Sequence, residues 1–217
     1  MNVLAFRDVH AHAVWPLRGR IAKRSIDLVL STVLLALLAP VFAVLAIAVL
    51  AADGRPIFYR WDVVGLEGRP FTGWKFRTMV QDADRLRERL LHRNEMSGPV
   101  FKLQNDPRIT RLGRILRHYS LDELPQLWSV FRGDMSLVGP RPSFPHEYAQ
   151  LTESQRRRLS VKPGITCLWQ IEGRSALAEF DHWLELDFRY IDEWSIRTDL
   201  KILLRTIPAV LSGRGAW

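Results

Sequence analysis

The longest uninterrupted apolar run in the chain covers residues 28–52 and holds no charged residue. It exceeds the ~20 residues that mark a membrane-helix candidate, and it starts too late and runs too long for a cleavable signal peptide. Pro40 lies at its middle and predicts a kink, because proline removes one backbone donor and clashes with the preceding turn. A buried helix of a soluble protein is the disfavoured alternative, since such helices rarely continue this far without polar residues.

Basic residues lie on both sides of this run. They are Arg18, Arg20, Lys23 and Arg24 before it and Arg55, Arg60 and Arg69 after it. Basic flanks of a membrane segment tend to stay on the cytoplasmic side. Because both flanks are basic here, a full span has no preferred direction, whereas a hairpin keeps both flanks on the cytoplasmic side. Each arm of ~12 residues reaches about 18 Å, roughly half of a ~30 Å hydrocarbon core. Residues 18–55 are therefore predicted to form a re-entrant membrane helix, although a proline kink also occurs in true spans.

The rest of the chain alternates between short strand-like and amphipathic patterns, which predicts a mainly α fold with a few short β-strands. Strands are expected at 56–59 and 69–78, around a turn that contains Gly65 and Gly68. Helical periodicity is found in 80–94, 108–118, 121–131, the later part of 143–159, 177–193 and 196–211. The basic amphipathic helices are expected to lie flat on an anionic leaflet, with ordinary solvated faces as the alternative.

The charge balance points to anionic partners. The 217 residues include 31 Lys and Arg against 23 Asp and Glu, a net charge of +8. Such a charge suits nucleic acid, anionic lipid headgroups or phosphorylated substrates. The single cysteine, Cys167, excludes an internal disulfide and argues for reducing surroundings. The histidines show no metal-ligand spacing, and no P-loop, dinucleotide fingerprint or Ser-His-Asp order is present.

Two adjacent carboxylates, Asp122 and Glu123, are the strongest candidates for chemistry. Ser120 is predicted to cap a helix here, and Glu123 at the third position after it fits a capping box, which is the structural explanation of the pair. A carboxylate beside a helix N-terminus and cations stays ionised, as a nucleophile toward phosphorus must be. A second carboxylate beside it suits Mg²⁺, which takes one or two carboxylates plus substrate phosphate oxygens.

Several cations and polar residues are candidates for binding a phosphorylated substrate. Arg141 lies between two prolines, whose stiff backbone suits bidentate phosphate binding, although pairing with a nearby acid explains it equally well. Lys75 and Arg77 alternate on a predicted strand, and Arg117 directly precedes the acidic pair. Further candidates, each more often structural when taken singly, are Arg174, Asp187 and Asp199.

Five motifs in order resemble those of the bacterial sugar transferases, which are monotopic phosphoglycosyl transferases or polyprenyl-phosphate hexose-1-phosphate transferases. They read KFRTM at 75–79, DPRIT at 106–110, SLDELPQL at 120–127, GDMSLVGPRP at 133–142 and KPGIT at 162–166. The resemblance covers about residues 20–217, and the length is similar to that of the short exopolysaccharide type.

The resemblance implies a mechanism. Asp122 attacks the β-phosphate of a UDP-sugar, with galactose or glucose expected, and UMP is released. Undecaprenyl phosphate then takes the sugar phosphate from the aspartate and becomes undecaprenyl-diphosphate-sugar. Glu123, with Asp122, holds Mg²⁺. The resemblance places Arg141, Arg174, Asp187 and Asp199 at the nucleotide-sugar site. Together with the cations named above, the expected substrate-binding residues are Lys75, Arg77, Arg117, Arg141, Arg174, Asp187 and Asp199.

The resemblance also implies a location and an organisation. Residues 1–17 are expected to form an N-terminal arm, 18–55 the re-entrant membrane helix, and 56–217 a compact catalytic domain on the cytoplasmic face of the bacterial inner membrane. The expected partners are the UDP-sugar, undecaprenyl phosphate and anionic lipids, without nucleic acid; a homodimer is left open. Ala39 stands where the family has serine before the proline, and Cys167 stands where it has glycine.

A second hypothesis is a membrane-tethered protein that binds polyanions without catalysis. The net charge of +8 and the basic helices support it. The absence of a known groove-reading motif counts against it.

Overall fold

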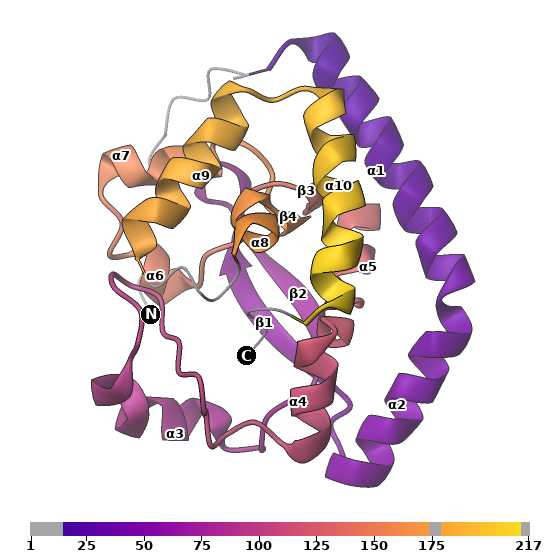
Figure 1. The fold of residues 1–217 in the computed structure, drawn as a ribbon, viewed down its shortest axis with the longest axis vertical. Coiled ribbons are helices and arrows are strands. Elements are labelled where there is room, and N and C mark those ends of the chain that lie inside the picture. Colours follow the sequence, from indigo (N-terminus) through magenta and orange to yellow (C-terminus); the bar gives the residue numbers. More distant parts are fainter. Residues whose placement is uncertain (1–14, 174–178, 214–217) are drawn as a thin grey trace.

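A bent pair of helices forms one long edge of the molecule (Figure 1). In this computed structural model, which describes residues 15–173 and 179–213, α1 (Leu17–Leu37) and α2 (Ala39–Asp53) meet at an angle of 60°. Among the described residues no helix alone is long and apolar enough to cross a membrane, and this bent pair is the one combination that reaches that length and composition. The predicted kink is confirmed. The break falls at Leu38, so Pro40 occupies the first turn of α2, where its missing N–H is tolerated.

The strands form two small sheets. β1 (Phe58–Val64) pairs antiparallel with β2 (Pro70–Phe76), and a 3₁₀ turn at Leu66–Gly68 joins them. β3 (Ser136–Val138) pairs in parallel with β4 (Gly164–Thr166). The β1–β2 hairpin matches the two predicted strands with shifted ends.

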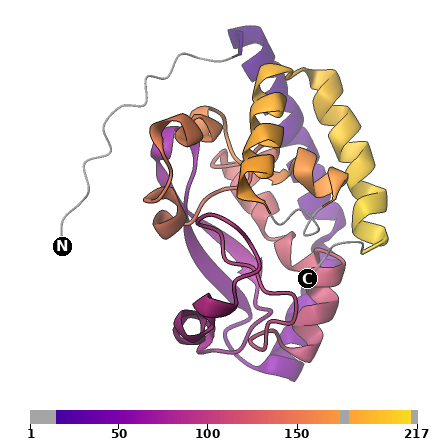
Figure 2. The same ribbon diagram turned by 60° about the vertical axis from the view of Figure 1, so that its left-hand side comes forward.

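Helices surround these sheets, so the prediction of a mainly helical chain with few short strands is confirmed. Figures 1 and 2 both show α10 beside α1, with α6 and α7 near one end of the β1–β2 hairpin and α3 near the other. The helices are α3 (Ala83–Leu90), α4 (Arg111–His118), α5 (Gln126–Arg132), α6 (Pro145–Tyr148), α7 (Glu153–Arg156), α8 (Leu168–Glu172), α9 (Phe180–Asp192) and α10 (Ile196–Leu211).

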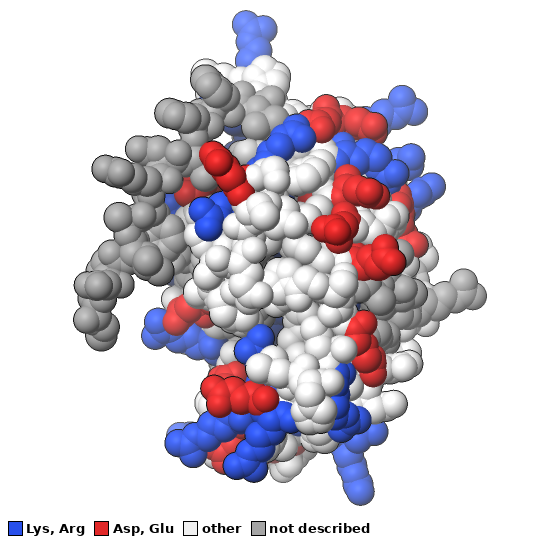
Figure 3. Space-filling view, turned by 90° about the vertical axis from the view of Figure 1, so that its left-hand side faces the viewer, with Lys and Arg blue, Asp and Glu red and all other residues white. Residues whose placement is uncertain are grey.

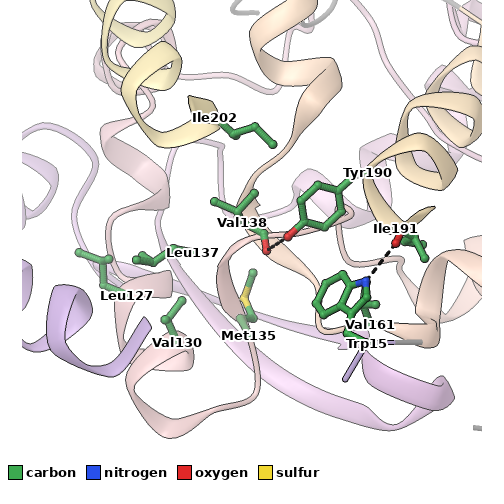
Figure 4. Close-up of a cluster of buried hydrophobic side chains, with 10 residues drawn as sticks. All are labelled: Trp15, Leu127, Val130, Met135, Leu137, Val138, Val161, Tyr190, Ile191 and Ile202. Carbon is green, nitrogen blue, oxygen red and sulfur yellow. Dashed lines mark hydrogen bonds between the residues drawn. The ribbon is translucent and has the colours of Figure 1, made fainter. Parts of the chain in front are cut away.

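The largest hydrophobic core joins α5, β3, α9 and α10 (Figure 4). Two polar groups inside it are satisfied by backbone carbonyls: Tyr190 Oη donates to Val138 O at 3.0 Å, and Trp15 Nε1 donates to Ile191 O at 3.0 Å. Trp15, one of the last residues of the predicted N-terminal arm, is therefore part of the core. Residues 1–14 of that arm lie outside the described residues.

Helix α1 turns its polar face toward the protein. Lys23, Asp27 and Ser31, spaced four residues apart, are its buried residues. Asp27 Oδ1 accepts a hydrogen bond from the backbone N–H of Leu137 at 3.0 Å, and Lys23 Nζ donates to Asp199 Oδ2 at 2.6 Å. The apolar residues of α1 lie on two sides: Leu30, Leu34 and Leu35 pack partly buried against the largest core, whereas Val29, Val33 and Leu37 are exposed. A surface helix in water instead buries its apolar stripe and exposes its charged residues.

The helix predicted over 121–131 is present from Gln126 as α5, but its predicted start and the Ser120 cap are wrong. Ser120 has φ 52° and ψ 24°, which is the left-handed region, and its side chain does not cap. The chain turns there into a short 3₁₀ segment, Leu121–Glu123, and α5 begins only after Pro125. The acidic pair therefore lies in a tight turn between α4 and α5, without a capping box.

Cys167 is unstrained at the position where the family has glycine. It has φ −154° and ψ 175°, an extended backbone that any residue adopts. The thiol is buried, and burial raises its pKa well above the usual range, so it remains protonated.

Gly113→Ala is expected to destabilise the protein by about 1–3 kcal/mol. A Cβ at this position of α4 would lie 2.1 Å from the carbonyl oxygen of Thr78, a backbone atom that accepts from the N–H of Thr110. Chemical unfolding in detergent measures the effect. Arg114→Ala on the exposed side of the same helix is the control and should shift stability by less than about 0.5 kcal/mol. Equal stability of the two variants would contradict this packing.

Candidate active site

A cavity of about 1370 Å³ lies between the β1–β2 hairpin, α3, the loop that follows α3 and the turn that carries the acidic pair. Its volume exceeds the ~300–1,000 Å³ that is usual for a single small ligand. Six of the predicted site residues line it: Lys75, Arg77, Arg117, Asp122, Glu123 and Arg141. The structure thus brings together residues that are far apart in the sequence.

Two leucines hold the acidic turn in place. Leu121 and Leu124, on either side of the acids, pack against a buried cluster from α2, β2 and α4. This cluster consists of Leu45, Val49, Phe76 and Leu116. Because the leucines flank the two acids in this tight turn, packing the leucines against the cluster directs the carboxylates toward the cavity. Asp122 keeps 7% of its surface exposed.

Glu123 is ion-paired with Lys75, whose Nζ lies 2.8 Å from Glu123 Oε1. Burial by itself would raise the pKa of Glu123, but Lys75, with help from Arg141 and Arg117, brings the pKa below its usual value. Lys75 Nζ also lies 4.3 Å from the centre of the Trp61 ring. Glycine at the position paired with Trp61 across the hairpin makes room for that ring, since a Cβ on Gly73 would lie 2.3 Å from Trp61 Nε1.

Asp122 is shifted in the opposite direction. Burial and, next, the negative charge of Glu123 raise its pKa, while Lys75 and Arg117 act against the shift. The shift is thus opposite in direction to the one expected from a helix dipole and nearby cations. The pair instead divides into a well-stabilised anion, Glu123, and an anion of high free energy, Asp122. Such divided carboxylates are typical of catalytic sites.

Two arginines face the pair from different elements. Arg117 Nε donates to Thr78 Oγ1 at 2.9 Å, which ties α4 to the end of β2. Arg141 Nη1 lies 3.6 Å from Glu147 Oε1, so the predicted pairing with a nearby acid is present, although Arg141 also lines the cavity. Both guanidinium groups act electrostatically on Glu123. They are placed to balance the charge of a bound phosphate.

Arg77 is also at the cavity wall, but its guanidinium points to backbone carbonyls. It donates to the carbonyls of Arg55 at 2.7 Å and Gly54 at 2.9 Å, and also to that of Asp53. These bonds fasten the C-terminal end of α2 to β2. The guanidinium N–H groups of Arg77 are thus used for structural hydrogen bonds.

Two predicted substrate-binding residues do not line the cavity. Asp187 Oδ2 pairs with Arg158 Nη2 at 2.7 Å, where both side chains are only 2% exposed, and burial raises the pKa of Asp187 to about 6 while Arg158 opposes the shift. Asp199 accepts from Lys23, Tyr190 and Trp194. Both carboxylates therefore compensate buried donors away from the cavity wall, and their contact with the nucleotide sugar stays a prediction. Arg174 lies outside the described residues.

The sequence analysis missed several cavity residues. Phe101, Lys102, Trp169 and Gln170 line the cavity, the first two from a segment that showed only loop signals. Asn94 organises this segment: its side-chain amide donates to the carbonyls of Met96 and Val100. A loop that is held by the hydrogen bonds of one asparagine side chain shows no periodic pattern in the sequence.

The donor set fits a magnesium ion held by few protein ligands. The described part of the chain contains no group of three or more side chains that could form a complete metal cage. Asp122 and Glu123 supply two adjacent carboxylates in a cavity with room for phosphate oxygens. Mg²⁺ prefers this combination, and its charge would offset the repulsion that raises the pKa of Asp122.

Comparison with known proteins identifies the family. The family model described as bacterial sugar transferase matches residues 18–213. The chain belongs to the bacterial sugar transferases. The predicted family is thereby confirmed, and with it the prediction of an enzyme.

Relatives of this sugar transferase include proteins of very different lengths. Galactosyl transferase CpsE of Streptococcus agalactiae serotype III is 46% identical over 196 residues, which cover 90% of this chain and 43% of the relative. Exopolysaccharide production protein ExoY of Rhizobium meliloti is 40% identical over 209 residues, 94% of this chain and 92% of the relative. The chain thus spans nearly the full length of some relatives and about two fifths of others.

Asp199→Ala is expected to destabilise this sugar transferase by about 3–5 kcal/mol, because it leaves the buried Lys23 ammonium uncompensated. Unfolding measurements in detergent test this. Asp192→Ala, which removes an exposed partner of Arg157, is the control and should cost less than about 1 kcal/mol. Unchanged stability combined with a raised KM for the sugar donor would instead support the substrate-binding role first predicted for Asp199.

Asp122→Asn is expected to raise the melting temperature, Tm, by a few degrees at neutral pH. The pKa of Asp122 is higher in the folded than in the unfolded state, so its ionisation costs the folded protein free energy once the pH exceeds the folded-state pKa. Glu123→Gln should lower Tm, because a depressed folded-state pKa stabilises at neutral pH and this stability is lost as the pH falls through it. Shifts of the same sign in both variants would contradict the divided pair.

Proposed function

We propose that this sugar transferase moves a sugar 1-phosphate from a UDP-sugar to undecaprenyl phosphate, giving undecaprenyl-diphosphate-sugar and UMP. The observation that carries the proposal is the divided acidic pair in a cavity lined by Lys75, Arg117 and Arg141. Relatives support it by name: UDP-glucose:undecaprenyl-phosphate glucose-1-phosphate transferase of Escherichia coli is 40% identical, and undecaprenyl-phosphate galactose phosphotransferase of Salmonella typhimurium is 39% identical. The transferred sugar is accordingly glucose or galactose.

The reaction proceeds in two displacements at phosphorus. A carboxylate oxygen of Asp122 attacks the β-phosphorus, the bond from that phosphorus to the bridging oxygen breaks, and UMP leaves with the electron pair. An oxygen of undecaprenyl phosphate then attacks the phosphorus of the acyl phosphate, and the Asp122 carboxylate is released. The high free energy of the Asp122 anion favours the first attack. Binding the UDP-sugar with its β-phosphorus close to Asp122 further increases the rate, because the reacting atoms are already positioned.

The other residues manage charge. Glu123 remains ionised through Lys75, and Arg117 and Arg141 face the phosphates as their charge moves to the leaving group. Mg²⁺ held by Glu123 and Asp122 would supply a Lewis acid for the phosphate oxygens. The cavity volume of about 1370 Å³ accommodates the nucleotide sugar and a lipid phosphate headgroup together.

The apolar surface of the bent helix supports a membrane location. On α1 and α2, Val33, Leu37, Val44 and Ile47 are each more than half exposed. The neighbouring α10 exposes an apolar row at Leu200, Leu204, Ile207 and Leu211. An apolar surface of this extent marks a membrane or protein contact. We place α1 and α2 in the bilayer as a re-entrant pair, on the cytoplasmic face of the bacterial inner membrane, with anionic lipids against the basic flanks.

The face in Figure 3 gives little support to the polyanion-binding hypothesis, because red side chains lie beside the blue ones around an uncharged centre. A polyanion binder also has no use for two adjacent carboxylates, which repel the ligand.

Asp122→Asn is expected to reduce UMP release by at least about 10³-fold and to abolish the labelled covalent adduct formed from a UDP-sugar labelled in its β-phosphate. The assay uses a panel of UDP-sugars with undecaprenyl phosphate and Mg²⁺. Asp134→Asn is the matched control, since Asp134 pairs with Arg132 outside the cavity and should retain activity. Retained adduct in Asp122→Asn would overturn the assignment of the nucleophile.

A further inference from the structure

Lys102 is a cation in the cavity wall that the proposed mechanism does not use. Its Nζ lies 4.3 Å from the centre of the Trp183 ring and 5.3 Å from that of Trp169. These two rings stack at 4.1 Å with 4° between their planes, and Trp183 is fully buried. Lys102 therefore rests on a rigid aromatic platform.

The backbone of Lys102 is fixed as firmly as its side chain. Its N–H donates to Asn94 Oδ1 at 2.8 Å, and its carbonyl accepts from the N–H of Glu95 at 2.9 Å. A lysine on a surface loop usually keeps its rotamer freedom. Here that freedom is already lost before a ligand binds, which lowers the entropic cost of a contact made by the ammonium.

Arg141 connects Lys102 with the acidic pair. It acts electrostatically on Glu123 and also on Lys102, whose pKa is lowered to about 7 by burial, with Arg141 adding to the shift and Cys167 opposing it. Two neighbouring cations repel each other, and an anion bound between them relieves the repulsion. The wall beside Arg141 therefore suits an anionic group separate from the one that faces Asp122.

We propose that Lys102, together with Arg141, binds the α-phosphate of the UDP-sugar, which is the phosphate that leaves with UMP. This inference rests on the proposed function. The β-phosphate lies at Asp122 and Arg117, and the neighbouring α-phosphate extends past Arg141 toward the aromatic platform. The Lys102 ammonium then stabilises the negative charge that develops on the leaving UMP. Lys102 thus contributes both to binding of the UDP-sugar and to departure of UMP.

The test is equilibrium binding of a UDP-sugar, UMP and uridine to the full chain in detergent. The Asp122→Asn background prevents turnover of the UDP-sugar, and the variants are Lys102→Met, Lys102→Arg and the exposed control Lys201→Met. Lys102→Met is expected to weaken UDP-sugar and UMP binding by about 10- to 100-fold, with uridine binding unchanged. Lys102→Arg should restore most of the affinity, and Lys201→Met should behave as the parent.

Two results would overturn the inference. Unchanged affinity of Lys102→Met for UMP would remove the phosphate contact, and an equal loss for UMP and uridine would show that Lys102 only supports the platform. Thermal unfolding of each variant is measured in parallel, and Lys102→Arg, which keeps the charge, separates loss of folding from loss of a contact. Either result leaves the proposed function in place, whereas a parent enzyme that releases no UMP from any UDP-sugar would overturn that function and leave the binding data interpretable.

Discussion

The acidic turn depends on the burial of Leu121 and Leu124 against the C-terminal half of α2. The local backbone hydrogen bonds of the turn are few, since it begins with a left-handed serine, lacks a capping side-chain bond and forms a single short 3₁₀ segment. Both leucines are partly buried, so each contributes less than the roughly 1.5–3 kcal/mol of a fully buried side chain, and the ion pair of Lys75 with Glu123 adds to this. The same helix carries the exposed apolar surface, so membrane contact and the placement of the acids are joined in one element.

The buried charges of the protein are stabilised to different degrees. The protein stabilises Glu123 through Lys75 and leaves Asp122 with a raised pKa, so the reactive group is also the unfavourable one for the fold. Other buried charges are paired: Lys23 with Asp199 and Arg158 with Asp187. These pairs bind α1 to α10 and the Arg157–Ser160 turn to α9. The unfavourable charge of Asp122 lies at the site where it serves the reaction, as is usual for active sites.

Sequence reasoning succeeded where local pattern decides the outcome. The apolar run, its kink near Pro40 and helix α10 follow from composition and periodicity, and five of the six predicted residues that line the cavity lie in the motifs. It failed where distant partners decide. The buried polar face of α1, the structural roles of Asp187 and Asp199, and the left-handed Ser120 depend on tertiary contacts. Lys102 was missed because Asn94 shapes its loop through side-chain bonds that no periodic pattern reveals.

The central claim is that Asp122 carries the sugar phosphate covalently between the two displacements. Peptide mapping by mass spectrometry tests it most directly, after the enzyme is incubated with a UDP-sugar and Mg²⁺ without undecaprenyl phosphate and quenched in acid. The account predicts one peptide, containing Asp122, that gains a hexose phosphate and loses it again when undecaprenyl phosphate is added. A hexose phosphate on another residue would contradict the claim. So would a reaction in which UMP and undecaprenyl-diphosphate-sugar form in equal amounts while the Asp122 peptide stays unmodified both without and with undecaprenyl phosphate.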